Sequence, residues 1–190
     1  RSRRPCRREP VTIEVKSAAE LRLMRKAGLV VAEGLAAMCG AAAAGVTTAE
    51  LDAIGREVLA RNGAESSFLD YGSMWGVGFP GVACISVNDE LVHGVPGARV
   101  LQEGDLVSID FGAIVQGWHG DAARTIVVGT PSAEDLALIE ATREAMWAGA
   151  RAMRAGGRVG DVSRAIEDYV KSLPVRYGTL REYTGHGIGS

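Results

Sequence analysis

Apolar residues recur at alternating steps of three and four along the N-terminal part of the chain, which predicts a helix with one buried face. Ser17 and Glu20 have the spacing of a capping box and would start this helix, and the segment from Gly40 to Gly45 would end it. The residues expected on its buried face are Leu21, Met24, Gly28, Val31, Leu35 and Met38.

Three more helices are predicted from similar signals. Thr47 and Glu50 form a second capping box ahead of a helix that Gly63 closes. The third and fourth helices are expected over residues 132–156 and 161–173, each opening on a polar residue and ending at a glycine or before a proline.

Between the two helix pairs the pattern changes to short apolar runs and glycine-rich turns, which favours strands and loops over residues 64–92. Residues 101–128 read as β-structure throughout, and strand signals return at Val175 and near Tyr183. Paired helices and antiparallel hairpins predict an α+β fold rather than a doubly wound parallel sheet. Two helix pairs, each followed by strands, suggest a duplicated half whose second copy is incomplete.

The composition is that of one globular domain and argues against several functional classes. With 190 residues, 47% hydrophobic and 23% charged, the chain can bury a substantial core. A net charge of −2 gives no basic footprint for nucleic acid, and no apolar run is long enough to cross a membrane. Three separated cysteines form no C-x-x-C pair, so a reducing cytoplasm is the simplest location.

The two ends of the sequence differ from its middle. Residues 1–13 are rich in arginine without a following apolar run, which predicts a solvated, disordered arm rather than a secretion signal or a nucleic-acid contact. The chain opens on Arg1 and stops at Ser190 in a glycine-rich turn, so a processed or truncated polypeptide is expected. Residues 14–190 are expected to form one domain.

Two aspartates stand in the β segment, where burying carboxylates is costly unless a cation lies between them. The dipeptide Gln116-Gly117 suits a two-residue hairpin turn, because glycine readily takes the positive φ that such a turn needs. In that register Asp110 faces Ala123, and Asp121 emerges on the same face as Asp110. The two carboxylates would then be diagonal neighbours, about 7 Å apart at the backbone.

A carboxylate metal site and a solvated polar face both account for this pair, and the spacing leaves both open. His119 shares the predicted face, and a structural or supporting role is favoured over direct metal ligation. His93 and His186 lie beside glycines, where a ligand could approach closely. Nucleophile-elbow and phosphate-loop patterns are absent, and Cys84 in its apolar run is expected to be an inert thiol of the core or of a pocket wall.

Four ordered blocks of the sequence resemble the type I methionine aminopeptidases. They are residues 79–96 (FPGVACISVNDELVHGVP), 104–110 (GDLVSID), 117–121 (GWHGD) and 184–189 (TGHGIG), and the likeness runs from about Glu14 to the last residue. The resemblance implies the pita-bread fold, an α+β domain with pseudo-twofold halves around a curved antiparallel sheet. It implies removal of the initiator methionine from nascent polypeptides by two-metal hydrolysis, with Co, Mn, Fe or Zn.

The resemblance also implies roles for individual residues. His93 would be catalytic, hydrogen-bonding the scissile amide and helping its nitrogen to leave. His93, Phe79 and Cys84 would contact the substrate, and Phe79 and Cys84 would line an apolar slot for the methionine side chain. The metal ligands would be Asp110 for one ion, His186 for the other and Asp121 for both.

The family pattern continues beyond His186 with another histidine and two metal-binding glutamates, which would fall after Ser190. The present residues alone are therefore expected to bind metal weakly and not to cleave peptides, and segment 71–78 differs from the loop of many relatives. The resemblance implies a cytoplasmic monomer acting near the ribosome, without nucleic-acid or membrane partners. Two alternatives remain open: a Xaa-Pro aminopeptidase or prolidase-like peptidase, and a non-catalytic binding module on the same fold.

Overall fold

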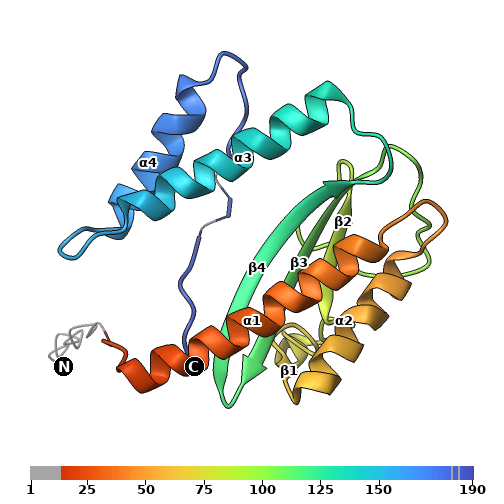
Figure 1. The fold of residues 1–190 in the computed structure, drawn as a ribbon, viewed down its shortest axis with the longest axis horizontal. Helices are drawn as coiled ribbons and strands as arrows, with labels where there is room; N and C mark the ends of the chain where they lie inside the picture. The colour runs from red at the N-terminus through yellow and green to blue at the C-terminus, as the bar shows by residue number, and fades with distance from the viewer. Residues whose placement is uncertain (1–13, 181, 184) are drawn as a thin grey trace, which may run out of the picture.

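The computed structural model describes residues 14–180, 182–183 and 185–190, so the arm expected over residues 1–13 lies outside it. Within the described residues, a helix pair precedes a sheet and a second helix pair follows it, which confirms the predicted α+β class (Figure 1). The helices are α1 (Ala18–Ala41), α2 (Thr48–Asn62), α3 (Ala133–Ala152) and α4 (Val159–Ser172).

The sheet is antiparallel and centred on its longest hairpin. Its strands are β1 (Glu65–Ser66), β2 (Ala83–Val87), β3 (Leu106–Val115) and β4 (Trp118–Val127), and a short 3-10 turn, η1 (Ser73–Trp75), lies between β1 and β2. Strand β3 pairs with β4 on one side and with β2 and β1 on the other. The predicted β segment 101–128 is therefore strand only from Leu106 onward, and Val175 and Tyr183 lie outside strands, contrary to prediction.

The capping boxes predicted from the sequence start the first two helices as expected. Ser17 accepts a hydrogen bond from the Glu20 backbone, and Thr47 does the same for Glu50. The C-cap residue of α2 is Gly63, which adopts the left-handed conformation with φ 59°. The capping-box spacing therefore predicted the starts of both helices correctly.

The buried face of α1 differs from the predicted stripe. Leu21 is 53% exposed and Gly28 is also exposed, because burial along α1 begins at Ala27 and follows the helix face that carries Ala27, Val30 and Gly34. The residues of α1 that are buried are Ala27, Val30, Val31, Gly34, Leu35 and Met38.

Helices α3 and α4 both begin near the predicted residues, but α3 ends earlier than predicted. Ser132 caps α3 through the Asp135 backbone, as the sequence indicates. Helix α3 stops at Ala152 rather than at Gly156, because Met153 turns to an extended backbone conformation. Helix α4 ends at Ser172, before Pro174.

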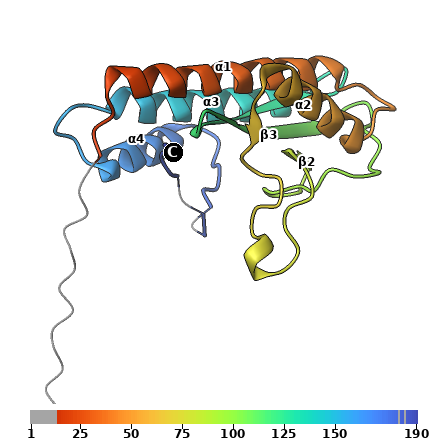
Figure 2. The same cartoon turned by 90° about the horizontal axis from the view of Figure 1, so that it is seen from below.

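Helices α1 and α2 cover one face of the sheet, and the loop that carries η1 projects from the opposite side (Figure 2). The core lies between these two helices and the sheet, and Phe111 of β3 is fully buried there against α1. A Cβ at Gly34 would overlap the Phe111 ring, and one at Gly120 would lie 2.7 Å from the Ala27 backbone, so both glycines allow close helix–sheet approach. The largest fully buried side chains are Phe111, Met38, Leu51, Ile85, Leu101 and Ile109.

Among the described residues, every helix is too short or too polar to span a lipid bilayer.

Candidate active site

The β3–β4 hairpin turns where the sequence predicts. Gln116 and Gly117 both have positive φ, at 52° and 81°, which gives a two-residue turn whose twist matches the flanking strands. Asp110 pairs with Ala123, and Gly112 pairs with Asp121, so the predicted register is confirmed. Because side chains alternate along a strand, Asp110 and Asp121 emerge on the same face, away from α1.

The two carboxylates lie together in a half-buried position. Cys84 of β2 pairs with Asp110, so the thiol stands beside the carboxyl group on this face. Burial, the neighbouring Asp121 carboxylate and the hydrogen bond between the two raise the pKa of Asp110 to about 7. Burial and the surrounding aspartates likewise raise the pKa of the Cys84 thiol to about 12, which keeps it protonated near neutral pH.

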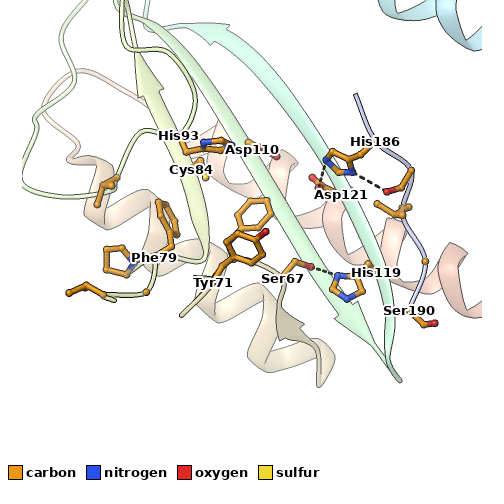
Figure 3. A pocket seen from close by; sticks show the side chains of 18 residues that line it. Ser67, Tyr71, Phe79, Cys84, His93, Asp110, His119, Asp121, His186 and Ser190 are labelled. Carbon is orange, nitrogen blue, oxygen red and sulfur yellow. Dashed lines mark hydrogen bonds and ion pairs between the residues drawn. The ribbon is translucent and has the colours of Figure 1, made fainter. Parts of the chain in front are cut away.

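His186 approaches the carboxylates from the C-terminal segment (Figure 3). Its Nε2 lies 4.0 Å from Asp121 Oδ2, while its Nδ1 lies 3.0 Å from the Gly187 carbonyl oxygen. A carbonyl can only accept, so this contact assigns the ring proton to Nδ1 and leaves Nε2 facing Asp121. In the described part of the chain, no three His, Cys, Asp or Glu side chains are grouped closely enough to hold one metal ion.

A cavity of about 880 Å³ opens on this face of the sheet. Its floor is the hairpin, and its walls come from residues 67–80, the His93 loop and residues 186–190 (Figure 3). All six residues singled out by the resemblance line this cavity, namely Phe79, Cys84, His93, Asp110, Asp121 and His186.

His119 makes a hydrogen bond at the edge of the cavity, whereas the sequence predicted only a structural or supporting role for it without naming a partner. His119 shares the carboxylate face, and its Nδ1 lies 3.0 Å from the Ser67 hydroxyl oxygen. Its backbone N–H donates to the Gly189 carbonyl oxygen at 2.8 Å, which ties the C-terminal segment to the edge of β4. Ser67 is far from His119 in sequence and follows no local pattern, so sequence reasoning missed it.

The segment that runs from the cavity residues Phe79 and Pro80 into β2 is held by hydrogen bonds to α2. The buried Asp52 accepts hydrogen bonds at Oδ1 from the backbone N–H groups of Val82 and Ala83, at 2.7 and 3.0 Å. Its Oδ2 accepts from Arg56 Nε at 2.8 Å, and the same guanidinium donates to the Pro80 carbonyl oxygen. The Asp52 carboxylate therefore holds the start of β2 directly, and through Arg56 it also holds Pro80, which precedes that strand.

The sequence model described as metallopeptidase family M24 matches residues 22–190. The class of protein defined by this sheet, with its paired aspartates and histidines in one cavity, is the metallohydrolases of the pita-bread fold.

Two methionine aminopeptidases are similar over nearly all of the chain. Methionine aminopeptidase 1 of Mycobacterium tuberculosis is 49% identical over 179 residues, covering 92% of this chain and 65% of that protein. The crystal structure of methionine aminopeptidase from Thermotoga maritima has a TM-score of 0.86 at 35% identity, covering 94% of this chain and 69% of that one. The chain therefore belongs to metallopeptidase family M24 and, within it, to the type I methionine aminopeptidases.

The chain spans about two thirds of the length of these two relatives. A prolidase from Pyrococcus furiosus is more distant, with a TM-score of 0.76 at 25% identity, covering 92% of this chain and 49% of that one. The sequence identity of this chain is therefore greater to the two methionine aminopeptidases than to this prolidase.

Proposed function

We propose that the protein removes the N-terminal methionine from proteins and peptides by metal-dependent hydrolysis. The observation that carries the proposal is the β3–β4 register, because it brings Asp110 and Asp121 onto one face of the cavity that His93 and His186 also line. The similarity to two methionine aminopeptidases supports the same reaction.

The side chains present suit divalent metal ions. Two carboxylates held together in a half-buried position are unfavourable without a positive charge between them. Carboxylate oxygens with an imidazole nitrogen form a donor set that suits Co, Mn, Fe and Zn. We assign Asp110 to one ion, His186 to the other and Asp121 to both; His186 Nε2 lies 4.0 Å from Asp121 Oδ2.

The chain's own residues would bind and orient the peptide. The chemistry that bound divalent ions supply is Lewis acidity, which makes water nucleophilic near neutral pH and polarises the peptide carbonyl. His93 hydrogen-bonds the scissile amide and assists the departure of its nitrogen. Phe79 and Cys84 line the apolar slot for the methionine side chain. Tyr183 packs edge-on against the His93 ring, with 6.3 Å between ring centroids.

Substrate profiling tests the reaction against its nearest alternative. The full-length gene product, loaded with Co²⁺ or Mn²⁺, is expected to hydrolyse Met-Ala-Ser and to leave Ala-Pro peptides intact. Preferential release of the first residue from Ala-Pro peptides would identify a Xaa-Pro aminopeptidase or prolidase-like enzyme instead. Binding of Met peptides without cleavage of either substrate would favour a non-catalytic module on this fold.

A pair of substitutions in the full-length protein tests the assignment of the carboxylates. Asp121→Asn removes a charged ligand with little change in volume and is expected to lower kcat by about a thousandfold or more, because charge stabilisation at such sites is worth several kcal/mol. Cys84→Ser alters the same face without removing a ligand and is expected to cost far less. Equal losses in the two variants, with unchanged circular dichroism, would refute the assignment.

Metal binding also has a readout that is independent of activity. A ligand that binds only the folded state raises its stability, by about 2.7 kcal/mol at a concentration of 100 times Kd. Mn²⁺ is therefore expected to raise the melting temperature, EDTA to reverse the shift, and Asp110→Asn to reduce it. A shift of the same size in the variant would show that the ion binds elsewhere.

The finer features implied by the resemblance are also proposals. We propose that two ions bind, drawn from Co, Mn, Fe or Zn, and that the substrates are nascent chains near the ribosome in the cytoplasm. We propose further that residues 14–190 fold as one domain of a monomer. Metal analysis of protein purified from its own host and light scattering in solution test the ion and the oligomeric state.

A further inference from the structure

The loop that carries His93 has little regular structure of its own. It leaves β2 through Asn88, whose φ is 59°, and runs over the sheet without entering a helix or strand before β3. Its apolar side chains are largely open to solvent, with Leu91 57% and Val95 57% exposed. Apart from the edge-on contact of Tyr183 with the His93 ring, packing of these loop side chains does little to fix the position of His93, which leaves a part for polar contacts.

A single buried hydroxyl group binds the loop on both sides of His93. Ser86 of β2 is 5% exposed, and its Oγ accepts a hydrogen bond from the Gly94 N–H at 3.0 Å. The same Oγ lies 3.4 Å from the Leu91 carbonyl oxygen, to which it donates. A serine hydroxyl has one proton to donate and lone pairs to accept, so Ser86 serves both contacts at once.

The loop also lies directly on the strand at Gly94. The Ile85 N–H donates to the Gly94 carbonyl oxygen at 2.9 Å, and a Cβ at Gly94 would overlap the Ile85 carbonyl oxygen. The residue after His93 is thus held at backbone contact distance from β2, next to the Ser86 hydroxyl. Gly94 is therefore joined to β2 twice, by its carbonyl oxygen to Ile85 and by its N–H to Ser86.

We infer that Ser86 is a positioning residue for His93, which it holds at the edge of the cavity by joining the Leu91 carbonyl and the Gly94 amide to β2. This inference rests on the proposed function, in which His93 acts on the scissile amide. Misplacement of a catalytic group by about 1 Å can lower a rate by about a hundredfold, whereas ground-state contacts of the methionine slot are made by other residues.

Ser108 provides a matched control for Ser86. It is the direct cross-strand partner of Ser86 and lies on the same face of the same sheet. Its hydroxyl oxygen accepts from Thr125 Oγ1 on β4 at 3.3 Å, on the side of β3 away from the His93 loop. Ser86→Ala and Ser108→Ala therefore delete the same atom at neighbouring positions, and only the first loosens the loop.

Kinetics of the full-length, metal-loaded enzyme test the inference with a double-mutant cycle. Ser86→Ala is expected to lower kcat about 10- to 100-fold while KM for Met-Ala-Ser changes by less than about threefold. In a His93→Ala background the same substitution should change kcat by less than about twofold, because the group it positions is absent. An equal loss in both backgrounds, or an equal loss from Ser108→Ala, would overturn the inference.

Nuclear magnetic resonance separates failure of this inference from failure of the proposed function. Ser86→Ala is expected to speed hydrogen exchange at the Gly94 amide and to shift the His93 ring signals, whereas Ser108→Ala should do neither. These signals report the loop whether or not the protein cleaves methionine. His93 signals in Ser86→Ala that coincide with those of the wild type would overturn the inference even in an active enzyme.

Discussion

Replacing Asp52 by alanine removes the carboxylate of α2 that holds the segment entering β2. Two buried backbone N–H groups, of Val82 and Ala83, then have no acceptor, and each such group costs about 1–3 kcal/mol. The contact with Arg56 is lost as well, but that guanidinium is 43% exposed and contributes little in solvent. The expected loss in free energy of unfolding is therefore about 2–6 kcal/mol.

Urea unfolding followed by circular dichroism measures this loss, as a fall in midpoint without a change in slope. Asp52→Asn keeps an oxygen that can accept the two amides and is expected to lose less than Asp52→Ala. Glu33→Ala is the control, because Glu33 also accepts from an arginine and from a second donor, but at an exposed position. Equal midpoints for Asp52→Ala and Glu33→Ala would show that the two amides find other partners and would refute the argument.

The remaining predictions concern two glycines and one thiol. Gly34→Ala is expected to destabilise the protein by about 1–3 kcal/mol, because its Cβ would overlap the Phe111 ring, whereas Gly28→Ala on the same helix meets open space and should stabilise it by about 0.5–1 kcal/mol. Urea midpoints check both signs, and a gain from each substitution would contradict the packing argument. Cys84, with its pKa raised to about 12, should resist iodoacetamide at pH 8 until the protein is unfolded, and mass spectrometry showing equal rates in buffer and urea would contradict this.

Local signals predicted the hairpin and the helix starts because their causes are local. The Gln116-Gly117 turn fixes the register of β3 and β4, and the register alone places Asp110 and Asp121 on one face. Capping boxes similarly involve residues three positions apart, so their spacing is visible in the sequence.

Features that depend on long-range contacts were missed or misplaced. Leu21 follows the helical period of α1 but is exposed, since the period does not state how far the sheet extends beneath a helix. The partnership of Ser67 with His119 and the two bonds of Ser86 to the His93 loop arise from chain segments brought together only by the fold. The strand expected at Val175 failed for the same reason, because a strand needs a neighbour.

The single hairpin that carries both aspartates has a consequence for the order of folding. Closing a short turn has a low loop-closure entropy, and hairpins form within microseconds, so Asp110 and Asp121 come together through local contacts. His93 and His186 reach the same place only after the chain has closed much longer loops. The positions of the two carboxylates therefore depend on one local turn and on the packing of Phe111 and Gly120 against α1, whereas the cavity walls depend on contacts between distant segments.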